Sequence, residues 1–351
     1  MRHRSRLLTM TLTAGLLLAA CTDPGTDTGA DAAGPVRLLT HDSFDVSTEV
    51  LETFTADTGI DVEVIPLGDA GSALNRVILT KDDPEGDVLF GVDSTFLTRA
   101  LAEDLFLPHR AAGLDAVDPA LLPDDERVTP IDFGDVCVNY DRGWFAEAGL
   151  PVPADLAALA DDRYAGLLAV QNPATSSPGL AFLLGTIARL GEDAAFTFWE
   201  RLRANDVLVT DGWSDAYYGA FTHASDGDRP LVVSYASSPP AEVLFAAEPT
   251  DTAPTGVIVD TCYRQVEYAG VLASTPRPDA ARALLDHLLS PAFQADVPLT
   301  MFVFPARTDV PLPDVFTAHA VLPDEPLTLD PARIDAGREG WIERFTDTVL
   351  R

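Results

Sequence analysis

Residues 36–67 read VRLLTHDSFDVSTEVLETFTADTGIDVEVIPL, and this stretch predicts a strand, a helix and a second strand in succession. The mostly apolar run 36–39 predicts the first strand, and the alternating run 61–67 predicts the second. Between them, apolar residues recur at helical spacing over residues 46–58, and Gly59 marks the end of the helix. Strands that alternate with helices in this way are typical of a parallel sheet covered by helices.

The same alternation continues along the chain and begins a second time after a loop rich in Pro and Asp at residues 118–127. Further strands are predicted at residues 87–91, 132–140, 167–171, 207–210, 231–234 and 263–273. Further helices are predicted at residues 72–81, 94–105, 178–190, 192–205, 214–224, 277–289, 292–297 and 331–349, and from residue 240 onward. Two successive α/β units predict two lobes, each a mainly parallel sheet flanked by helices, with a ligand cleft between the lobes.

The first residues have the layout of a secretory signal peptide. A basic head precedes an uncharged, mostly apolar run over residues 7–20, and Leu18-Ala19-Ala20-Cys21 resembles the bacterial lipobox, whose cysteine is lipidated. We therefore predict a lipoprotein signal peptide (1–20), then a lipidated Cys21 and a flexible tether (21–34). An ordinary cleaved signal is the alternative, and a membrane span is disfavoured because it needs roughly 20 apolar residues. The expected location is the outer face of the cytoplasmic membrane, with the exported chain anchored by lipid.

The composition is strongly acidic, with 55 Asp and Glu against 23 Lys and Arg and a formal net charge of −32. Such a chain repels nucleic acid and anionic lipid, so we predict no nucleic-acid partner and no binding to membranes through a basic patch. The electrostatic field favours a cation as partner. The acidity also has a simpler interpretation, which is that it keeps an exported protein soluble.

Polar and aromatic residues gather where the predicted strands end. They are Thr40-His41-Asp42-Ser43, Asp93-Ser94, Asn172 to Ser177, Asp211-Gly212-Trp213 and Ser234 to Ser238. Ligands bind beyond the carboxyl ends of strands in open parallel sheets. These turns therefore predict one ligand site.

One of these turns places three hydroxyl groups at the start of a predicted helix. Thr175, Ser176 and Ser177 come before Pro178 and Gly179. Amide N–H groups and the helix dipole at such a start suit an anion such as phosphate. Simple helix capping, which needs only one hydroxyl, is the alternative interpretation.

Aromatic residues lie in or near two other turns. Trp213, Tyr217, Tyr218 and Tyr235 would together attract an organic cation, because aromatic faces are electron-rich. Most aromatic residues in proteins belong to the core, but Trp213 lies in a turn between a glycine and a serine.

The sequence contains no recognisable catalytic motif. His41 and Asp42 could suggest a dyad, but the chain has no G-x-S-x-G nucleophile motif. A His beside an Asp in sequence need not contact it in space. No Cys/His cluster has the spacing of a zinc site. We therefore predict that the protein is not an enzyme and uses no cofactor.

Six short motifs occur in an order that resembles the thiamine-binding proteins of bacterial ABC importers. They are Asp42-Ser43-Phe44, Gly91-Val92-Asp93, Asp132-Phe133-Gly134, Asn172 to Leu180, Gly212 to Tyr217 and Ser234 to Pro239, and the resemblance extends from about Val36 to the final helix. It implies the type II periplasmic-binding-protein fold. It also implies a monomer that captures thiamine or its phosphate esters and delivers the ligand to ABC permease subunits in the membrane. Closure of two lobes around the ligand would be the function.

The resemblance and the strand-end turns together predict the ligand-binding residues. These are His41, Asp42, Asp93, Ser94, Thr175, Ser176, Ser177, Gly179, Trp213, Tyr217, Tyr235, Ser237 and Phe302. Aromatic walls and a carboxylate suit the cationic thiazolium and the flat aminopyrimidine of thiamine. His41 and Phe302 stand where tyrosine and tryptophan are usual in the family. These departures leave open the choice among thiamine, its phosphates and a related pyrimidine.

Two other ligands suit the same fold. The adjacent Tyr217 and Tyr218, with His41 and a carboxylate, could provide hard oxygen and nitrogen ligands for ferric iron. Neighbouring residues on a helix point about 100° apart, so both tyrosines reach one ion only from irregular backbone. A polyamine or another organic cation is the second alternative. We predict thiamine and no metal site.

The two-lobe arrangement assigns residues 35–130 and about 263–312 to lobe 1 and residues 131–262 to lobe 2. Residues 313–351 form a C-terminal segment whose final helix packs on the lobes. Cys137 and Cys262 then lie where the chain crosses between the lobes. Exported proteins meet oxidising conditions, so we predict a Cys137–Cys262 disulfide near the hinge. Two buried free thiols are the alternative.

Overall fold

The computed structural model describes residues 34–351. The predicted signal peptide, the predicted lipidated Cys21 and all but the last residue of the predicted tether lie outside the described residues. Within residues 34–351, no helix is both long enough and apolar enough to cross a membrane.

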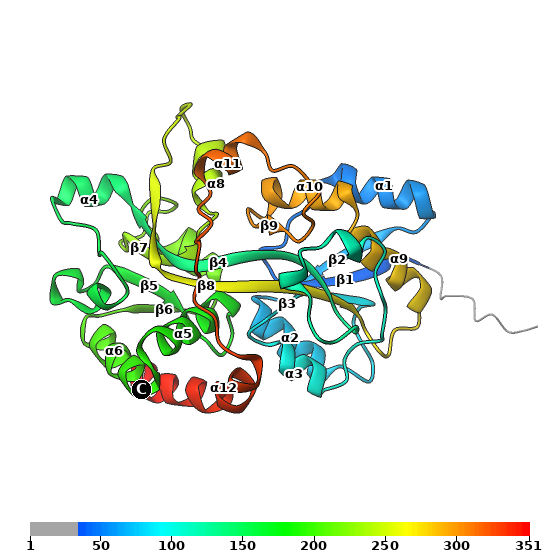
Figure 1. Cartoon of the computed structure of the whole chain (residues 1–351), viewed down its shortest axis with the longest axis horizontal. Helices are drawn as coiled ribbons and strands as arrows, with labels where there is room; N and C mark the ends of the chain where they lie inside the picture. Colours follow the sequence, from blue (N-terminus) through cyan, green and yellow to red (C-terminus); the bar gives the residue numbers. More distant parts are fainter. Residues whose placement is uncertain (1–33) are drawn as a thin grey trace, which may run out of the picture. The chain divides into compact units, whose positions relative to one another are not determined.

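A nine-stranded sheet runs through the molecule in the order β2-β1-β3-β8-β4-β7-β5-β6, with β9 beside β4 (Figure 1). The strands are β1 Val36–Thr40, β2 Val62–Pro66, β3 Val88–Asp93, β4 Thr129–Asp141, β5 Leu168–Gln171, β6 Leu208–Thr210, β7 Leu231–Tyr235, β8 Thr255–Val271 and β9 Phe304–Pro305. β1 pairs parallel with β2 and β3, and β5 pairs parallel with β6 and β7. β4 and β8 run antiparallel to each other and to their neighbours. Two parallel groups joined by a central antiparallel pair confirm the predicted α/β class.

Helices cover both faces of this sheet. They are α1 Thr48–Thr58, α2 Ala70–Leu79, α3 Leu97–Ala102, α4 Arg142–Ala148, α5 Ser177–Leu190, α6 Glu192–Ala204, α7 Trp213–Asp215, α8 Pro239–Leu244, α9 Pro278–Leu288, α10 Pro291–Thr300, α11 Asp314–His319 and α12 Pro331–Phe345. Shorter 3-10 or π turns are η1 Leu114–Ala116, η2 Pro119–Leu121, η3 Ala157–Ala160, η4 Asp162–Tyr164, η5 Ala216–Ala220 and η6 Thr346–Leu350. Figure 1 shows α2, α3, α5, α6 and α12 on one side of the sheet and α1, α8, α10 and α11 on the other.

The predicted and the observed elements differ in several places. β8 begins at Thr255, well before the predicted start at residue 263, because its first residues continue the pairing with β4. The predicted helix 214–224 is wrong in its second half, since α7 runs into the π turn η5 and the chain leaves the helix at Phe221. The sequence pattern does not predict α4, although Asp141 caps its start by accepting a hydrogen bond from the Trp144 amide at 3.0 Å.

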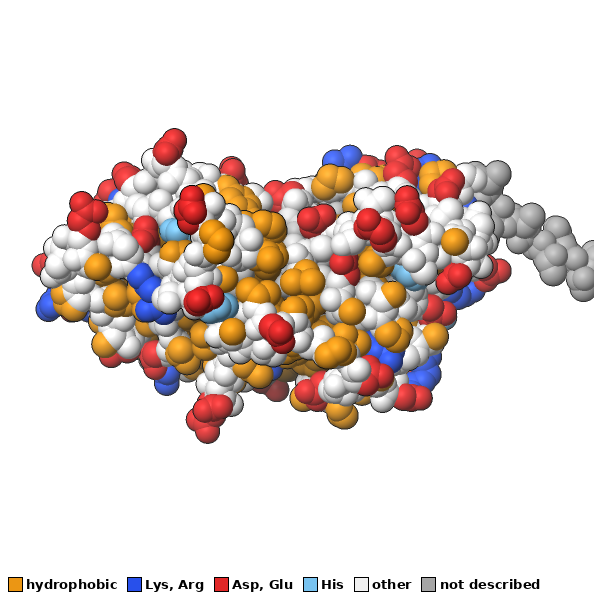
Figure 2. Space-filling view, turned by 90° about the horizontal axis from the view of Figure 1, so that it is seen from above, with side chains coloured by type: hydrophobic (Ala, Val, Ile, Leu, Met, Phe, Trp, Pro, Cys, Tyr) orange, Lys and Arg blue, Asp and Glu red, His pale blue; other side chains and the backbone are white. Residues whose placement is uncertain are grey.

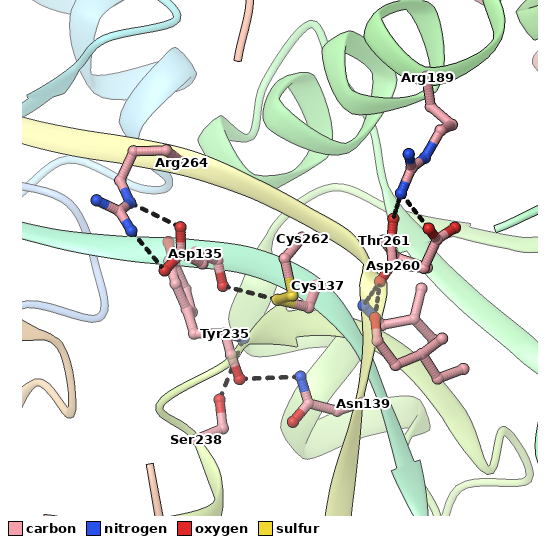
Figure 3. The surroundings of a disulfide bond; sticks show 12 residues. Asp135, Cys137, Asn139, Arg189, Tyr235, Ser238, Asp260, Thr261, Cys262 and Arg264 are labelled. Carbon is pink, nitrogen blue, oxygen red and sulfur yellow. Dashed lines mark hydrogen bonds and ion pairs between the residues drawn. A yellow bond between two sulfur atoms is a disulfide. The ribbon is translucent and has the colours of Figure 1, made fainter. Parts of the chain in front are cut away.

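The long strands β4 and β8 lie side by side and join the two parallel groups (Figure 1). Their register is broken between Val136 and Val138. The Cys137–Cys262 disulfide bridges this break with its Cα atoms 4.2 Å apart, which confirms the predicted pairing (Figure 3). The predicted strand begins at residue 263, just after Cys262. In the structure β8 begins earlier, and Cys262 lies inside it. Beside the disulfide, the Thr261 hydroxyl accepts a hydrogen bond from the Val138 amide at 2.8 Å and so replaces a lost ladder bond.

The final helix α12 contacts elements from both ends of the sheet. The Arg338 guanidinium donates hydrogen bonds to the Thr95 carbonyl oxygen at 3.2 Å and to the Thr98 hydroxyl at 2.8 Å, both of which follow β3. At the other end of the helix, Phe345 packs edge-on against Trp199 of α6, with ring centroids 4.8 Å apart. This helix therefore holds the group β1–β3 beside the group β5–β7.

Candidate functional site

A cavity of about 960 Å³ opens beside the middle of the sheet. One wall comes from the loop after β1 (residues 41–45) and from the end of α10 and the turn before β9 (299–303). The other comes from α7, η5, α8 and the loop that follows α8. Figure 2 views the molecule from the side of α8, α10 and α11, where apolar side chains gather toward the middle and acidic ones are spread over the outer parts. Because the walls come from opposite halves of the sheet, the cavity is a cleft between those halves.

Aromatic rings form much of the cleft wall. Trp213 stacks on Tyr217 with ring centroids 4.9 Å apart and an interplanar angle of 20°. The Trp213 indole N–H donates a hydrogen bond to the Ser234 hydroxyl at 2.9 Å, which sets the orientation of the indole. Phe245 from the wall of α8 contacts Phe302 from the opposite wall, edge-on at 5.7 Å. Phe302 has a left-handed backbone with φ 55°, which is rare for a bulky residue and is found mostly where function requires it.

Glu242 of α8 connects two other side chains of this wall. It accepts a hydrogen bond from the Tyr217 hydroxyl at 2.6 Å, and its second oxygen lies 3.0 Å from Nε2 of His223. Burial opposes ionisation of Glu242, but these partners hold its pKa below the ordinary value. The hydrogen bond to Glu242 raises the pKa of His223, and burial raises the pKa of Tyr217 well above its usual range. Tyr217 therefore stays protonated and acts as a donor to an ionised Glu242.

Glu267 of β8 forms an acidic floor for the cleft and is 9% exposed. One of its carboxyl oxygens lies 3.6 Å from Nε2 of His41. Burial opposes a charge on His41, but Glu267, Asp69 and Asp42 together raise its pKa above the ordinary value. Gly91, with φ 93°, makes room for the imidazole, because a Cβ at this position would lie 2.5 Å from the His41 ring.

Asp93 lies behind the cleft wall at a junction of three elements. One of its carboxyl oxygens accepts hydrogen bonds from the Ser177 hydroxyl of α5 and from Nε2 of Gln265 at 2.7 Å. The other accepts a bond from the Thr95 hydroxyl at 2.7 Å. Burial raises the pKa of Asp93 to about 6 against the opposing effect of these bonds. The structure thus gives this carboxyl a role in joining β3, α5 and β8.

The hydroxyl-rich start of α5 has partners within the protein. Ser176 caps the helix by accepting a hydrogen bond from the Gly179 amide at 3.4 Å, and the Thr175 hydroxyl donates to the Asp211 carbonyl oxygen at 2.6 Å. Gly179 is required by packing, because a Cβ there would lie 2.6 Å from the backbone oxygen of Gln171. Capping and close packing account for these residues.

A protein carboxylate already lies at this helix start. Asp69 accepts hydrogen bonds from the backbone amides of Ser177 at 3.1 Å and Trp213 at 2.9 Å. The Ser177 amide belongs to the helix start that is predicted to suit a phosphate, whereas the Trp213 amide belongs to α7. An added phosphate would therefore compete with Asp69 for the Ser177 amide.

Only part of the predicted site lines the cleft. The lining includes His41, Asp42, Trp213, Tyr217, Tyr235 and Phe302. The remaining predicted residues lie outside the lining: Asp93, Ser94, Thr175, Ser176, Ser177, Gly179 and Ser237. Sequence reasoning missed Glu242, Phe245 and Glu267, which do line it. For Glu267 a signal existed, since it is a charged residue between Val266 and Tyr268 in a predicted strand.

The tyrosine pair does not present two equivalent hydroxyl groups. The rings of Tyr217 and Tyr218 meet at 81° with centroids 5.4 Å apart, and Tyr218 is 62% exposed, whereas Tyr217 is buried against Glu242. The raised pKa of Tyr217, caused mainly by burial, disfavours the phenolate that ferric iron prefers. Within residues 34–351, no group of three or more His, Cys, Asp or Glu side chains is arranged to hold a metal ion.

Comparisons with known proteins agree with this geometry. Residues 83–328 match the family described as bacterial extracellular solute-binding protein. The thiamine-binding periplasmic protein of Escherichia coli (strain K12) is 31% identical over 339 residues, which cover 95% of this chain and 98% of that relative. A solved structure, periplasmic thiamin binding protein, has a TM-score of 0.79 at 30% identity and covers 90% of this chain and 96% of its own. Iron uptake protein A2 of Synechocystis sp. is 29% identical over 278 residues, or 74% of this chain and 76% of that protein. These similarities confirm the type II periplasmic-binding-protein fold and the resemblance carried by the six motifs.

Proposed function

Because this chain belongs to the bacterial extracellular solute-binding protein family, we propose that it is the substrate-binding component of an ABC importer for thiamine or a thiamine phosphate. It captures the ligand in the cleft and delivers it to permease subunits in a membrane. Binding and release are the whole of this function, so no chemical reaction is involved. The identity of about 30% to thiamine-binding periplasmic proteins over nearly the full chain supports this choice of ligand.

One observation carries the proposal: the cleft has aromatic walls and an acidic floor. Of the described residues that line it, none is Lys or Arg, and the basic side chains are those of His41 and His223. Thiamine has a permanently cationic thiazolium and a flat aminopyrimidine. Aromatic faces stabilise such a cation by about 0.5–2 kcal/mol each, and Glu267 supplies an opposite charge.

We propose the lobe boundaries on the same basis. Lobe 1 comprises residues 35–130 and about 263–312, lobe 2 comprises residues 131–262, and the C-terminal segment packs on both. Support comes from the sheet, in which β4 and β8 are the strands that connect the two parallel groups. We also propose, from the sequence alone, that lipid on Cys21 anchors the exported chain to the outer face of the cytoplasmic membrane.

The native chain without its first 33 residues is expected to bind thiamine, with quenching of tryptophan fluorescence, because Trp213 lies in the cleft wall. Titrations with thiamine, thiamine monophosphate and thiamine diphosphate compare the three forms directly. Spermidine serves as the control cation, and it is expected to bind more weakly because it has no flat ring for the aromatic walls. Failure of all three thiamine forms to bind would refute the proposed function.

The tyrosine pair separates thiamine from ferric iron as the ligand. The native protein is expected to stay colourless with ferric iron, since a tyrosinate–iron complex absorbs visible light. Tyr235→Ala is expected to weaken thiamine binding by about 1–2 kcal/mol, and Tyr218→Ala by less, because Tyr235 is half-buried in the cleft wall and Tyr218 is exposed. Isothermal titration calorimetry measures both. A coloured protein that loses iron in Tyr217→Phe would favour the iron alternative instead.

A further inference from the structure

Three acidic residues lie in one row across three neighbouring strands. Glu267 of β8 is paired with Asp93 of β3 on one side and with Asp132 of β4 on the other. Asp93 has donors from Ser177, Thr95 and Gln265, as described above. Asp132, unlike Asp93, has no such hydrogen-bond donors among the described residues.

Asp132 is fully buried, and among the described residues neither of its carboxyl oxygens has a hydrogen-bond donor. A buried, ionised carboxylate without a donor is very unfavourable, because it loses its hydration without compensation. Its neighbour across the ladder is another carboxyl group, that of Glu267. Both effects, with burial the larger, raise the pKa of Asp132 well above its ordinary value.

The titratable groups around this pair supply little positive charge. His41 of the loop after β1 faces Glu267 at 3.6 Å. Asp42 of the same loop, Asp69 before α2, Asp93 of β3 and Tyr235 of β7 are the other ionisable groups near the pair. Four of these five neighbours are neutral or negative, so at most one positive charge balances the row.

We propose that Asp132 holds a proton in the empty protein, and that an organic cation placed against its neighbour Glu267 in the cleft displaces this proton. The cation then lies against Glu267, which lines the cleft, and Asp132 lies behind Glu267, buried in the sheet. Before binding, the pair carries one negative charge; after binding, it carries two, which the cation and His41 face. The proton leaves to the buffer, so one cation is exchanged for up to one proton. This inference rests on the proposed function, since it assigns recognition of the thiazolium to the carboxyl pair Asp132 and Glu267.

Proton exchange has a consequence that simple charge attraction lacks. Affinity for the cation rises with pH over the range in which the empty pair still holds its proton, because fewer protons must then be displaced. It levels off once the pair is already ionised in the empty protein. A neutral ligand gains nothing from ionisation of the pair, so its affinity does not rise in the same way.

Calorimetry on the native chain tests the exchange without any substitution. Thiamine is titrated between about pH 6 and pH 8 in buffers of different ionisation enthalpy, and the dependence of the measured heat on the buffer gives the number of protons released. We expect release of a substantial fraction of one proton per thiamine. The aminopyrimidine half of thiamine, used as a control ligand at about pH 8, where it is neutral, is expected to release none. Tight thiamine binding with no proton release would overturn this inference and leave the proposed function intact, whereas absence of binding would refute both.

Two variants identify the source of the proton. Asp132→Asn can donate an amide N–H to Glu267 and holds no exchangeable carboxyl proton, so release should fall to near zero and affinity at about pH 8 should fall about tenfold. Glu267→Gln should weaken binding at least as much, because Glu267 itself lines the cleft. Asp87→Asn is the matched control, since Asp87 is another buried carboxyl but has donors from Arg37 and Thr275. It is expected to keep native release and affinity. Undiminished proton release in Asp132→Asn would assign the proton to His41 and contradict the proposal.

Discussion

Reduction of the Cys137–Cys262 disulfide is expected to lower the free energy of unfolding by about 4–5 kcal/mol. The disulfide joins residues 125 apart in sequence, and cross-linking so long a loop removes much of the conformational entropy of the unfolded chain. In the folded protein the thiols would stay close, because β4 and β8 are paired on both sides of the bridge. Urea denaturation with and without reductant measures the loss directly.

A double variant, Cys137→Ala with Cys262→Ala, serves as the control for this prediction. It is expected to match the reduced native chain approximately in stability and to show no response to reductant. Thiamine affinity of this variant is expected to remain near the native value, since Arg264 and Asp135 still join β8 to β4 through bonds of 2.7 and 3.2 Å (Figure 3). Equal denaturation midpoints for oxidised and reduced native chains would contradict the expected role of the bridge.

Trp213→Ala is expected to weaken thiamine binding by about 1–3 kcal/mol, or roughly 5- to 150-fold. The indole is fixed between Tyr217, on which it stacks, and Ser234, to which it donates a hydrogen bond. A ring held in this way loses little conformational freedom when a ligand stacks on it. Its removal also exposes Tyr217, so part of the cleft wall is lost with it. Calorimetric titration of thiamine into the variant gives the change.

Two matched variants make this measurement specific. Trp213→Phe keeps an aromatic face but loses the bond to Ser234, so its affinity is expected to lie between those of the native chain and Trp213→Ala. Trp144→Phe removes a tryptophan from α4, outside the cleft lining, and should keep both native affinity and ligand-dependent quenching. Native affinity in Trp213→Ala would show that the indole does not contact the ligand.

Parts of the site were predictable from local sequence and parts were not. His41 follows β1 directly and Trp213 lies in the turn after β6, and the rule that ligands bind at strand ends identified both as wall residues. The same rule pointed to Ser177, but Asp69 accepts a hydrogen bond from its amide from 108 positions away in sequence. No local pattern reveals that a distant carboxylate takes up the donors of a helix start.

The amino-acid sequence by itself determined the alternation of strands and helices, the acidic character of the protein and its membership of a binding-protein family. It also restricted any disulfide within the folded part to one pairing, because Cys137 and Cys262 are the only cysteines beyond Cys21, but free thiols remained the alternative. Only the tertiary structure decided which carboxyl group lines the cleft floor and which one is buried beside it. That outcome depends on the register of β8 against β3 and β4, which sets Glu267 beside Asp132. Burial and unpaired charge arise from contacts between segments far apart in the chain, so the pKa of a carboxyl group is a property of the fold and not of its neighbours in sequence.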